Sequence, residues 1–144
     1  MGTWINPNGF TLRLTGKLIP GFPPWRRRVE YEFRLSRTRP LTYFSDDGRY
    51  IQPDRHGCTD MGSVPEFVQG VVPKDSALRS FILHDSGCRE RGLYFAATLA
   101  GPYTFLSMPS PEVHAMLRQG VTAERGPWLA RSVWCAVRTF GPRF

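Results

Sequence analysis

The sequence contains few cysteines and almost no lysine. Its 144 residues include three cysteines, at positions 58, 88 and 135, and no two of them have the C-x-x-C spacing. An odd number of widely spaced cysteines argues against a disulfide framework or a thiolate zinc ribbon, and suits a reducing compartment. Lysine occurs at positions 17 and 74 alone, so arginine supplies almost all of the positive charge.

Long apolar runs and a leader pattern are also missing. No run approaches the roughly 20 residues that a membrane-spanning helix needs. Residues Met1 to Asn8 lack the basic and then apolar pattern of a secretory signal. We therefore expect no membrane span and no secretion by a signal peptide.

The net charge of +7 is not gathered in one place. Arginines are spread from Arg13 to Arg143, and the one contiguous run is Arg26, Arg27 and Arg28. A nucleic-acid-binding domain concentrates such charge in one patch or stripe. The distribution argues against nucleic acid as the partner.

The first third of the chain has the alternation of half-buried strands. Val29, Tyr31, Phe33 and Leu35 alternate with polar residues, which predicts an antiparallel strand with one buried face. Shorter strands are predicted over residues 10–14, 41–44 and 50–52. The hydrophobic fraction of 41% is enough for one core, so we expect a single domain over 1–144, mainly β in 1–52 and mainly α in 53–144.

The remainder has helical spacing. A short helix is predicted from Ser63 to about residue 68, a second from Asp75 or Ser76 to Gly87, a third from Ser110 to Gly120, and a last one over 127–140. Cys135 falls in the apolar pattern of the last helix, which favours a packing role. The fold class is α+β, with a small N-terminal antiparallel sheet followed by three or four helices packed on it.

Two short polar segments stand out from this pattern. In the first, Thr59, Asp60 and Ser63 cluster where the strands pass into the helices. An Asx turn and a helix cap explain Ser63 well and Asp60 adequately. A polar functional site is the alternative.

The second segment ends in His84 and Asp85. On a helix, Asp85 follows Ile82 by three residues and Phe81 by four, so it falls on the apolar stripe, and His84 borders the same stripe. An inward carboxylate must be paired or hydrogen-bonded, because an isolated buried charge costs several kcal/mol. Either Asp85 belongs to a structural network, or His84 is a base or metal ligand oriented by a carboxylate.

Taken together, the two segments resemble a bacteriophage and prophage family known as domain of unknown function 1353. Thr59, Asp60, Ser63 and Pro65 match its first motif, and His84 with Asp85 match its second, over a resemblance of about residues 50–144. The chain departs from the family pattern at 86–88, where Ser, Gly and Cys replace an aromatic-rich stretch ending in Tyr. It departs again in the third helix, where His114 stands nearest to a family Asp.

The resemblance implies a phage protein, and two functions follow. The first is a virion, tail-associated or assembly protein, located in the virion or the host cytoplasm. Its contacts with other phage structural proteins would use the loop with Trp25, Arg26, Arg27 and Arg28, because Trp and Arg are frequent interface anchors. The second is a small hydrolase, metal-dependent or not and directed at the cell envelope, with Asp60, Ser63, His84 and Asp85 as catalytic candidates.

A divalent metal is compatible with the second function, and its candidate ligands are His84, Asp60 and His114, with His56 as an alternative. Adjacent side chains on a helix point about 100° apart, so His84 and Asp85 could share an ion only where the helix ends. We therefore expect a metal-free hydrogen-bonded network in preference to a metal site. We also expect Asp60 and Ser63 to lie within reach of His84 or Asp85.

Overall fold

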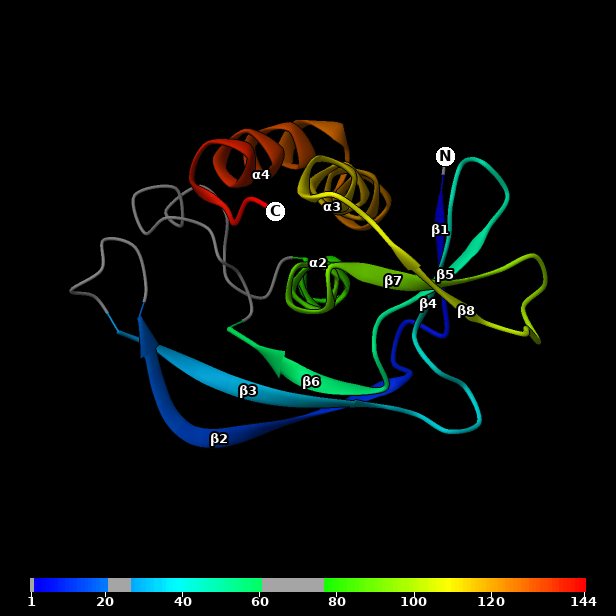
Figure 1. The fold of residues 1–144 in the computed structure, drawn as a ribbon, viewed down its shortest axis with the longest axis horizontal. Coiled ribbons are helices and arrows are strands. Elements are labelled where there is room, and N and C mark those ends of the chain that lie inside the picture. Colours follow the sequence, from blue (N-terminus) through cyan, green and yellow to red (C-terminus); the bar gives the residue numbers. More distant parts are fainter. Residues whose placement is uncertain (1, 21–26, 61–76) are drawn as a thin grey trace.

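A computed structural model describes residues 2–20, 27–60 and 77–144 of the chain (Figure 1). Those residues form two antiparallel sheets and three helices, which confirms the predicted α+β class. The strands are β1 (Thr3–Ile5), β2 (Phe10–Pro20), β3 (Arg27–Leu35), β4 (Thr42–Phe44), β5 (Tyr50–Gln52), β6 (His56–Thr59), β7 (Gly92–Ala96) and β8 (Thr104–Ser107). The helices are α2 (Leu78–Glu90), α3 (Ser110–Arg125) and α4 (Pro127–Phe140).

The strands form two sheets where the sequence predicted one. The larger has the order β1-β4-β5-β7-β8 and the smaller the order β2-β3-β6, with every neighbouring pair antiparallel. The alternation predicted for β3 buries Phe33 completely, whereas Val29 stays 39% exposed. The predicted apolar face of β3 is therefore buried at Phe33 and exposed to solvent at Val29.

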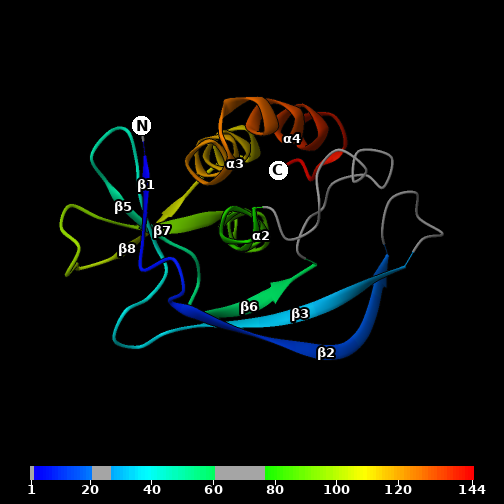
Figure 2. The same cartoon turned by 180° about the vertical axis from the view of Figure 1, so that it is seen from behind.

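Helix α2 is the central element of the fold. Figures 1 and 2 show it between the smaller sheet and α3, with α4 beyond α3. Ile82 packs with Phe33 of the smaller sheet, Leu83 packs with Leu93 of the larger sheet, and Phe81 belongs to the cluster formed with α3 and α4. Because apolar clusters surround α2, a polar side chain that points between them is removed from water.

Four strands were not predicted from the sequence: β1, β6, β7 and β8. They are three to five residues long, too short for alternation to be recognised. Their stability comes from pairing, since β7 is hydrogen-bonded to β5 on one side and to β8 on the other. Residues 53–144 are consequently less purely helical than expected.

The predicted helix ends at Gly87 and Gly120 are wrong. Helix α2 continues to Glu90 and α3 continues to Arg125. A Cβ atom at Gly87 would lie 2.8 Å from Cγ1 of Val113, and one at Gly120 would lie 2.8 Å from the hydroxyl of Ser80. Both glycines therefore mark places where α2 and α3 approach closely, a requirement that one-dimensional periodicity does not reveal.

This close approach predicts the effect of Gly87→Ala. In an exposed helix the change stabilises by about 1 kcal/mol, but here the new methyl group would overlap Val113. Overpacking of this kind costs about 1–3 kcal/mol, so we expect a net loss of stability in urea unfolding. The loss should shrink in the Val113→Ala background, where the clash is relieved. Additive effects of the two changes would contradict the explanation.

Two further expectations can be compared with the structure, and two others fall on residues that it does not describe. Cys135 is exposed, so its predicted packing role is wrong; the neighbouring Val133, Ala136 and Val137 form the buried side of α4. The predicted helix at 63–68 and the loop with Trp25 and Arg26 lie outside the described residues, as do the side chains of Arg27 and Arg28. None of the described helices has the length and apolar character needed to cross a membrane.

Candidate metal centre

Helix α2 carries two chemically active side chains on one face. His84 and Cys88 are four residues apart, the spacing that places side chains one above the other on a helix. His84 is buried, with 1% of its surface exposed, and Cys88 is partly buried. The Cys88 sulfur lies 3.4 Å from Nε2 of His84.

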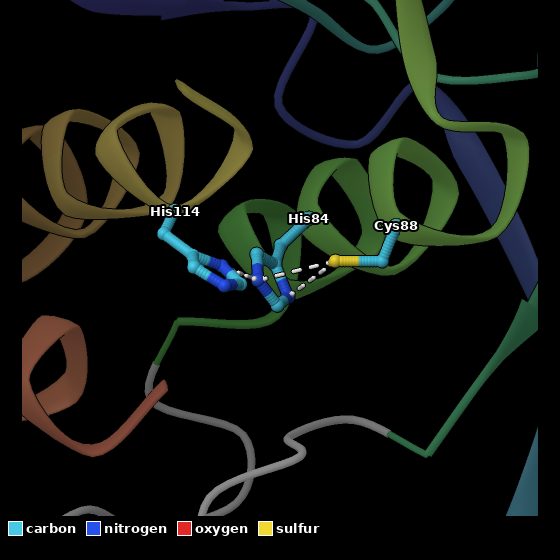
Figure 3. A group of neighbouring side chains, drawn as sticks. All are labelled: His84, Cys88 and His114. Atoms are coloured by element: carbon cyan, nitrogen blue, oxygen red, sulfur yellow. Dashed lines mark hydrogen bonds between the residues drawn. The ribbon is translucent and has the colours of Figure 1, made fainter. Parts of the chain in front are cut away.

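Helix α3 brings a second histidine to the same place. His114 is 5% exposed, and its Nδ1 lies 2.9 Å from Nε2 of His84. Figure 3 shows the His84 ring between His114 on one side and Cys88 on the other. One donor atom from each of the three side chains lies within 4.8 Å of the other two, and no other such group was found among the described residues.

The hydrogen bonds define which ring nitrogens carry protons. Nε2 of His114 lies 3.1 Å from the carbonyl oxygen of Pro142, which can only accept. Nε2 of His114 is therefore the protonated nitrogen, and the lone pair of Nδ1 points at His84. In the metal-free protein, Nε2 of His84 donates its proton to that lone pair.

Asp85 holds the other side of the His84 ring. One carboxylate oxygen lies 3.5 Å from Nδ1 of His84, and the other accepts a hydrogen bond of 2.5 Å from the hydroxyl of Thr59. The Asp85 side chain is 13% exposed, in agreement with the inward position predicted from its spacing. The polar chain Thr59–Asp85–His84–His114 thus links β6, α2 and α3.

The two histidines have opposite pKa shifts. Burial by itself lowers the pKa of His84, but hydrogen bonding to Asp85 and to Cys88 outweighs it and raises that pKa to about 9. Burial lowers the pKa of His114, and the positive charge of His84 lowers it further, against the Pro142 carbonyl, which raises it. At neutral pH the metal-free pair therefore consists of a charged His84 and a neutral His114.

Two of the three distances between donor atoms are close to those that a metal ion requires. Nitrogens about 2.1 Å from a tetrahedral zinc ion are about 3.4 Å apart, and a nitrogen and a thiolate sulfur are about 3.6 Å apart. The 2.9 Å between the histidine nitrogens would widen by about half an ångström, and the 3.4 Å between His84 and Cys88 would hardly change. A bound ion would take the place of the proton that lies between Nε2 of His84 and Nδ1 of His114.

The cluster opens on a cleft of about 400 Å³. Thr59 and Asp60, at the end of β6, form its wall together with His84, Asp85 and Cys88. Asp60 thus shares a cleft with His84 and Asp85, and its predicted side-chain reach to them stays a prediction. Ser63 lies outside the described residues.

Two of the proposed ligands lie elsewhere than in the three-residue cluster. Asp60 belongs to the wall of the cleft and not to the converging donors. His56 is exposed on β6, where its Nε2 lies 2.5 Å from a carboxylate oxygen of Glu32. His56 therefore pairs with Glu32 and lies apart from the three converging donors, and its alternative role as a ligand stays a prediction.

Cys88 was not recognised as a candidate ligand from the sequence. Its signal is the H-x-x-x-C spacing from His84, which places both side chains on one helix face. Because the helix was predicted to end at Gly87, Cys88 was expected in a loop, and the helical spacing from His84 was not recognised. The neighbouring His–Asp dipeptide does not share one ion; His84 faces the cluster while Asp85 holds its other nitrogen.

No protein-family model matches the chain, and no curated protein or solved structure is detectably similar to it. The site is therefore interpreted from its own geometry. A pair of histidines and a cysteine, with the second nitrogen of each histidine facing a protein acceptor, form a candidate site for one metal ion.

Proposed function

We propose that the chain is a small hydrolase that depends on one divalent metal ion bound by His84, Cys88 and His114. The observation that carries the proposal is the convergence of three donor atoms within 4.8 Å at the edge of a cleft. An unprotonated imidazole nitrogen and a thiol that converge on one point are donors that a metal ion can bind.

Zinc is the ion that suits this donor set. Two imidazoles and one thiolate are borderline and soft ligands, which favour zinc over magnesium or calcium. Three protein ligands leave the fourth tetrahedral position for water, the pattern of catalytic sites in contrast to closed structural ones. Zinc lowers the pKa of bound water to about 7, which supplies hydroxide for attack on a carbonyl or phosphoryl group.

The surrounding residues have distinct roles in this proposal. Asp85 is a positioning residue that orients His84 and is itself held by Thr59, while the Pro142 carbonyl orients His114. Asp60 lines the cleft next to the cluster and is the candidate general base for the attacking water. Ser63 remains a sequence-based candidate for the same cleft.

We propose further that this enzyme is phage-encoded and acts on a component of the host cell envelope; the phage origin rests on the resemblance of residues 50–144 to a phage family. Thr59, Asp60, His84 and Asp85, four of the residues that carry that resemblance, are among those that line the cleft. Cys88 and His114, where the chain departs from the family pattern, complete the metal ligands in this proposal.

The metal content of the protein tests the proposal directly. Protein purified without chelator, or dialysed against zinc, is expected to contain about one zinc ion per chain by elemental analysis. His84→Ala and His114→Ala should each abolish stoichiometric binding, because two donors leave too few ligands for a stable zinc site. Zinc-loaded protein should also hydrolyse members of a panel of 4-nitrophenyl esters and phosphates.

The control variant for the zinc measurement is His56→Ala, which removes an exposed histidine bound to Glu32 and should keep its zinc. Wild-type protein without zinc, or a His84→Ala variant that retains it, would contradict the proposal.

A virion or assembly function is the second candidate, and one observation favours it. Leu18 is 64% exposed, Leu14 is 60% exposed, and Leu18 pairs across the sheet with the partly exposed Val29. These apolar side chains flank the segment 21–28 in which Trp25 and the three arginines were predicted to contact other phage structural proteins. This candidate needs no metal, so a wild-type protein without zinc would leave it the better supported.

A further inference from the structure

A second hollow is lined by His114, which does not line the cleft. It has a volume of about 760 Å³ and is formed by the first turn of α3, the second half of α4 and the last residues of the chain. Figures 1 and 2 show the C-terminal segment beside both helices. This volume is in the range of pockets that hold small molecules, about 300–1,000 Å³.

The charged side chains that line this hollow are arginines. Arg138 comes from α4 and Arg143 from the C-terminal segment, and no acidic residue is among the described lining. No carboxylate of the described residues forms an ion pair with either arginine. Two unpaired guanidinium groups in one concave site attract an anion, because their planar donors match carboxylate and phosphate oxygens.

Aromatic rings complete the lining. The guanidinium of Arg138 lies 5.0 Å from the ring centre of Trp134, and Phe144 lines the same hollow. Stacking on Trp134 holds Arg138 in place and leaves its N–H groups available for a ligand. Ser110 and Pro111 add the first turn of α3, whose helix dipole also favours negative charge.

We infer that this hollow binds a small organic anion that has a flat apolar body. The anionic group, a carboxylate or a phosphate, lies on Arg138 and Arg143, and the apolar body lies against Trp134 and Phe144. The inference goes beyond the proposed hydrolase, because His114 is the one proposed metal ligand that lines this hollow among the described residues.

Phenyl phosphate is the probe for this site. Titration followed by calorimetry and by tryptophan fluorescence should give saturable binding with one site per chain. Inorganic phosphate should bind more weakly, because it lacks the ring. Benzoate separates a carboxylate ligand from a phosphate ligand. A metal ion would itself bind phosphate, so each titration is made with the protein as purified and repeated with EDTA present.

The arginines provide the decisive variants. Arg138→Ala combined with Arg143→Ala should weaken phenyl phosphate binding about tenfold or more, since each removes a charge-assisted hydrogen bond. Arg131→Ala is the matched control, because Arg131 is exposed on the same helix and does not line the hollow. Trp134→Leu should weaken phenyl phosphate binding more than inorganic phosphate binding, because it removes the ring contact as well as the support of Arg138.

Several results would overturn the inference. They are the absence of saturable binding, binding that is unchanged in the double variant, and binding that disappears with EDTA. Another hollow is lined by Arg34, Arg37 and Arg55 near the end of β3. Loss of binding in Arg37→Ala with Arg55→Ala, and not in the Arg138–Arg143 variant, would assign the anion to that hollow instead.

Discussion

Replacing Asp85 with alanine is expected to lower the free energy of unfolding of the metal-free protein by about 2–3 kcal/mol near pH 6. Hydrogen bonding to Asp85, and secondarily to Cys88, raises the pKa of His84 from 6.5 to about 9, and the whole rise corresponds to about 3 kcal/mol at 1.36 kcal/mol per unit. Without the carboxylate, a buried imidazolium would lose its counter-ion, which is a costly change. The hydroxyl of Thr59 would lose its acceptor as well.

The loss of stability in Asp85→Ala should depend on pH in a defined direction. Because the folded-state pKa of His84 is above its value in the unfolded chain, the stabilisation is fully present below pH 6.5 and is lost as the pH rises through about 9. The difference between wild type and Asp85→Ala should therefore be largest near pH 6 and small above pH 9. Urea unfolding in EDTA at a series of pH values measures it.

A matched carboxylate separates this effect from a general change of charge. Asp54 lies on the surface near Arg89, with 3.8 Å between the charged atoms, and such exposed pairs contribute little. Asp54→Ala should change stability by less than about 1 kcal/mol at every pH. A similar loss in both variants, or a loss in Asp85→Ala that does not depend on pH, would contradict the role assigned to His84.

Zinc is expected to stabilise the folded protein strongly. A ligand that binds the native state alone adds about 4 kcal/mol at a free concentration of 1,000 times its Kd. The melting temperature should therefore rise on addition of zinc, and the rise should be reversed by EDTA. Calcium should have no such effect, because it prefers a cage of six or more oxygen ligands.

The zinc effect should weaken as the pH falls. Binding displaces the proton that His84 shares with His114. Affinity should therefore fall by about tenfold per pH unit for each proton displaced. Calorimetry in buffers of different ionisation enthalpy counts these protons.

The cysteines provide the control for zinc stabilisation. Cys88→Ser should remove most of it, while Cys135→Ser, at an exposed cysteine of α4, should leave it intact. Equal stabilisation of the two variants would exclude Cys88 as a ligand.

The sequence was informative where one local pattern decides the structure. Alternation located β3, and helical spacing with proline near the first turn located the starts of α3 and α4. The same spacing placed Asp85 and His84 on the buried side of α2, because the direction of a helical side chain depends on the helix itself. The α+β class follows from these elements together.

The tertiary structure decided what depends on the approach of distant segments. Gly87 and Gly120 lie inside helices because α2 and α3 pack closely there, whereas the sequence predicted ends at both. The short strand β7 exists because β5 and β8 pair with it. The cluster of His84, Cys88 and His114 joins residues 30 positions apart, and no local pattern links them. Side-chain direction is a property of one element, but the convergence of donor atoms is a property of how two elements pack.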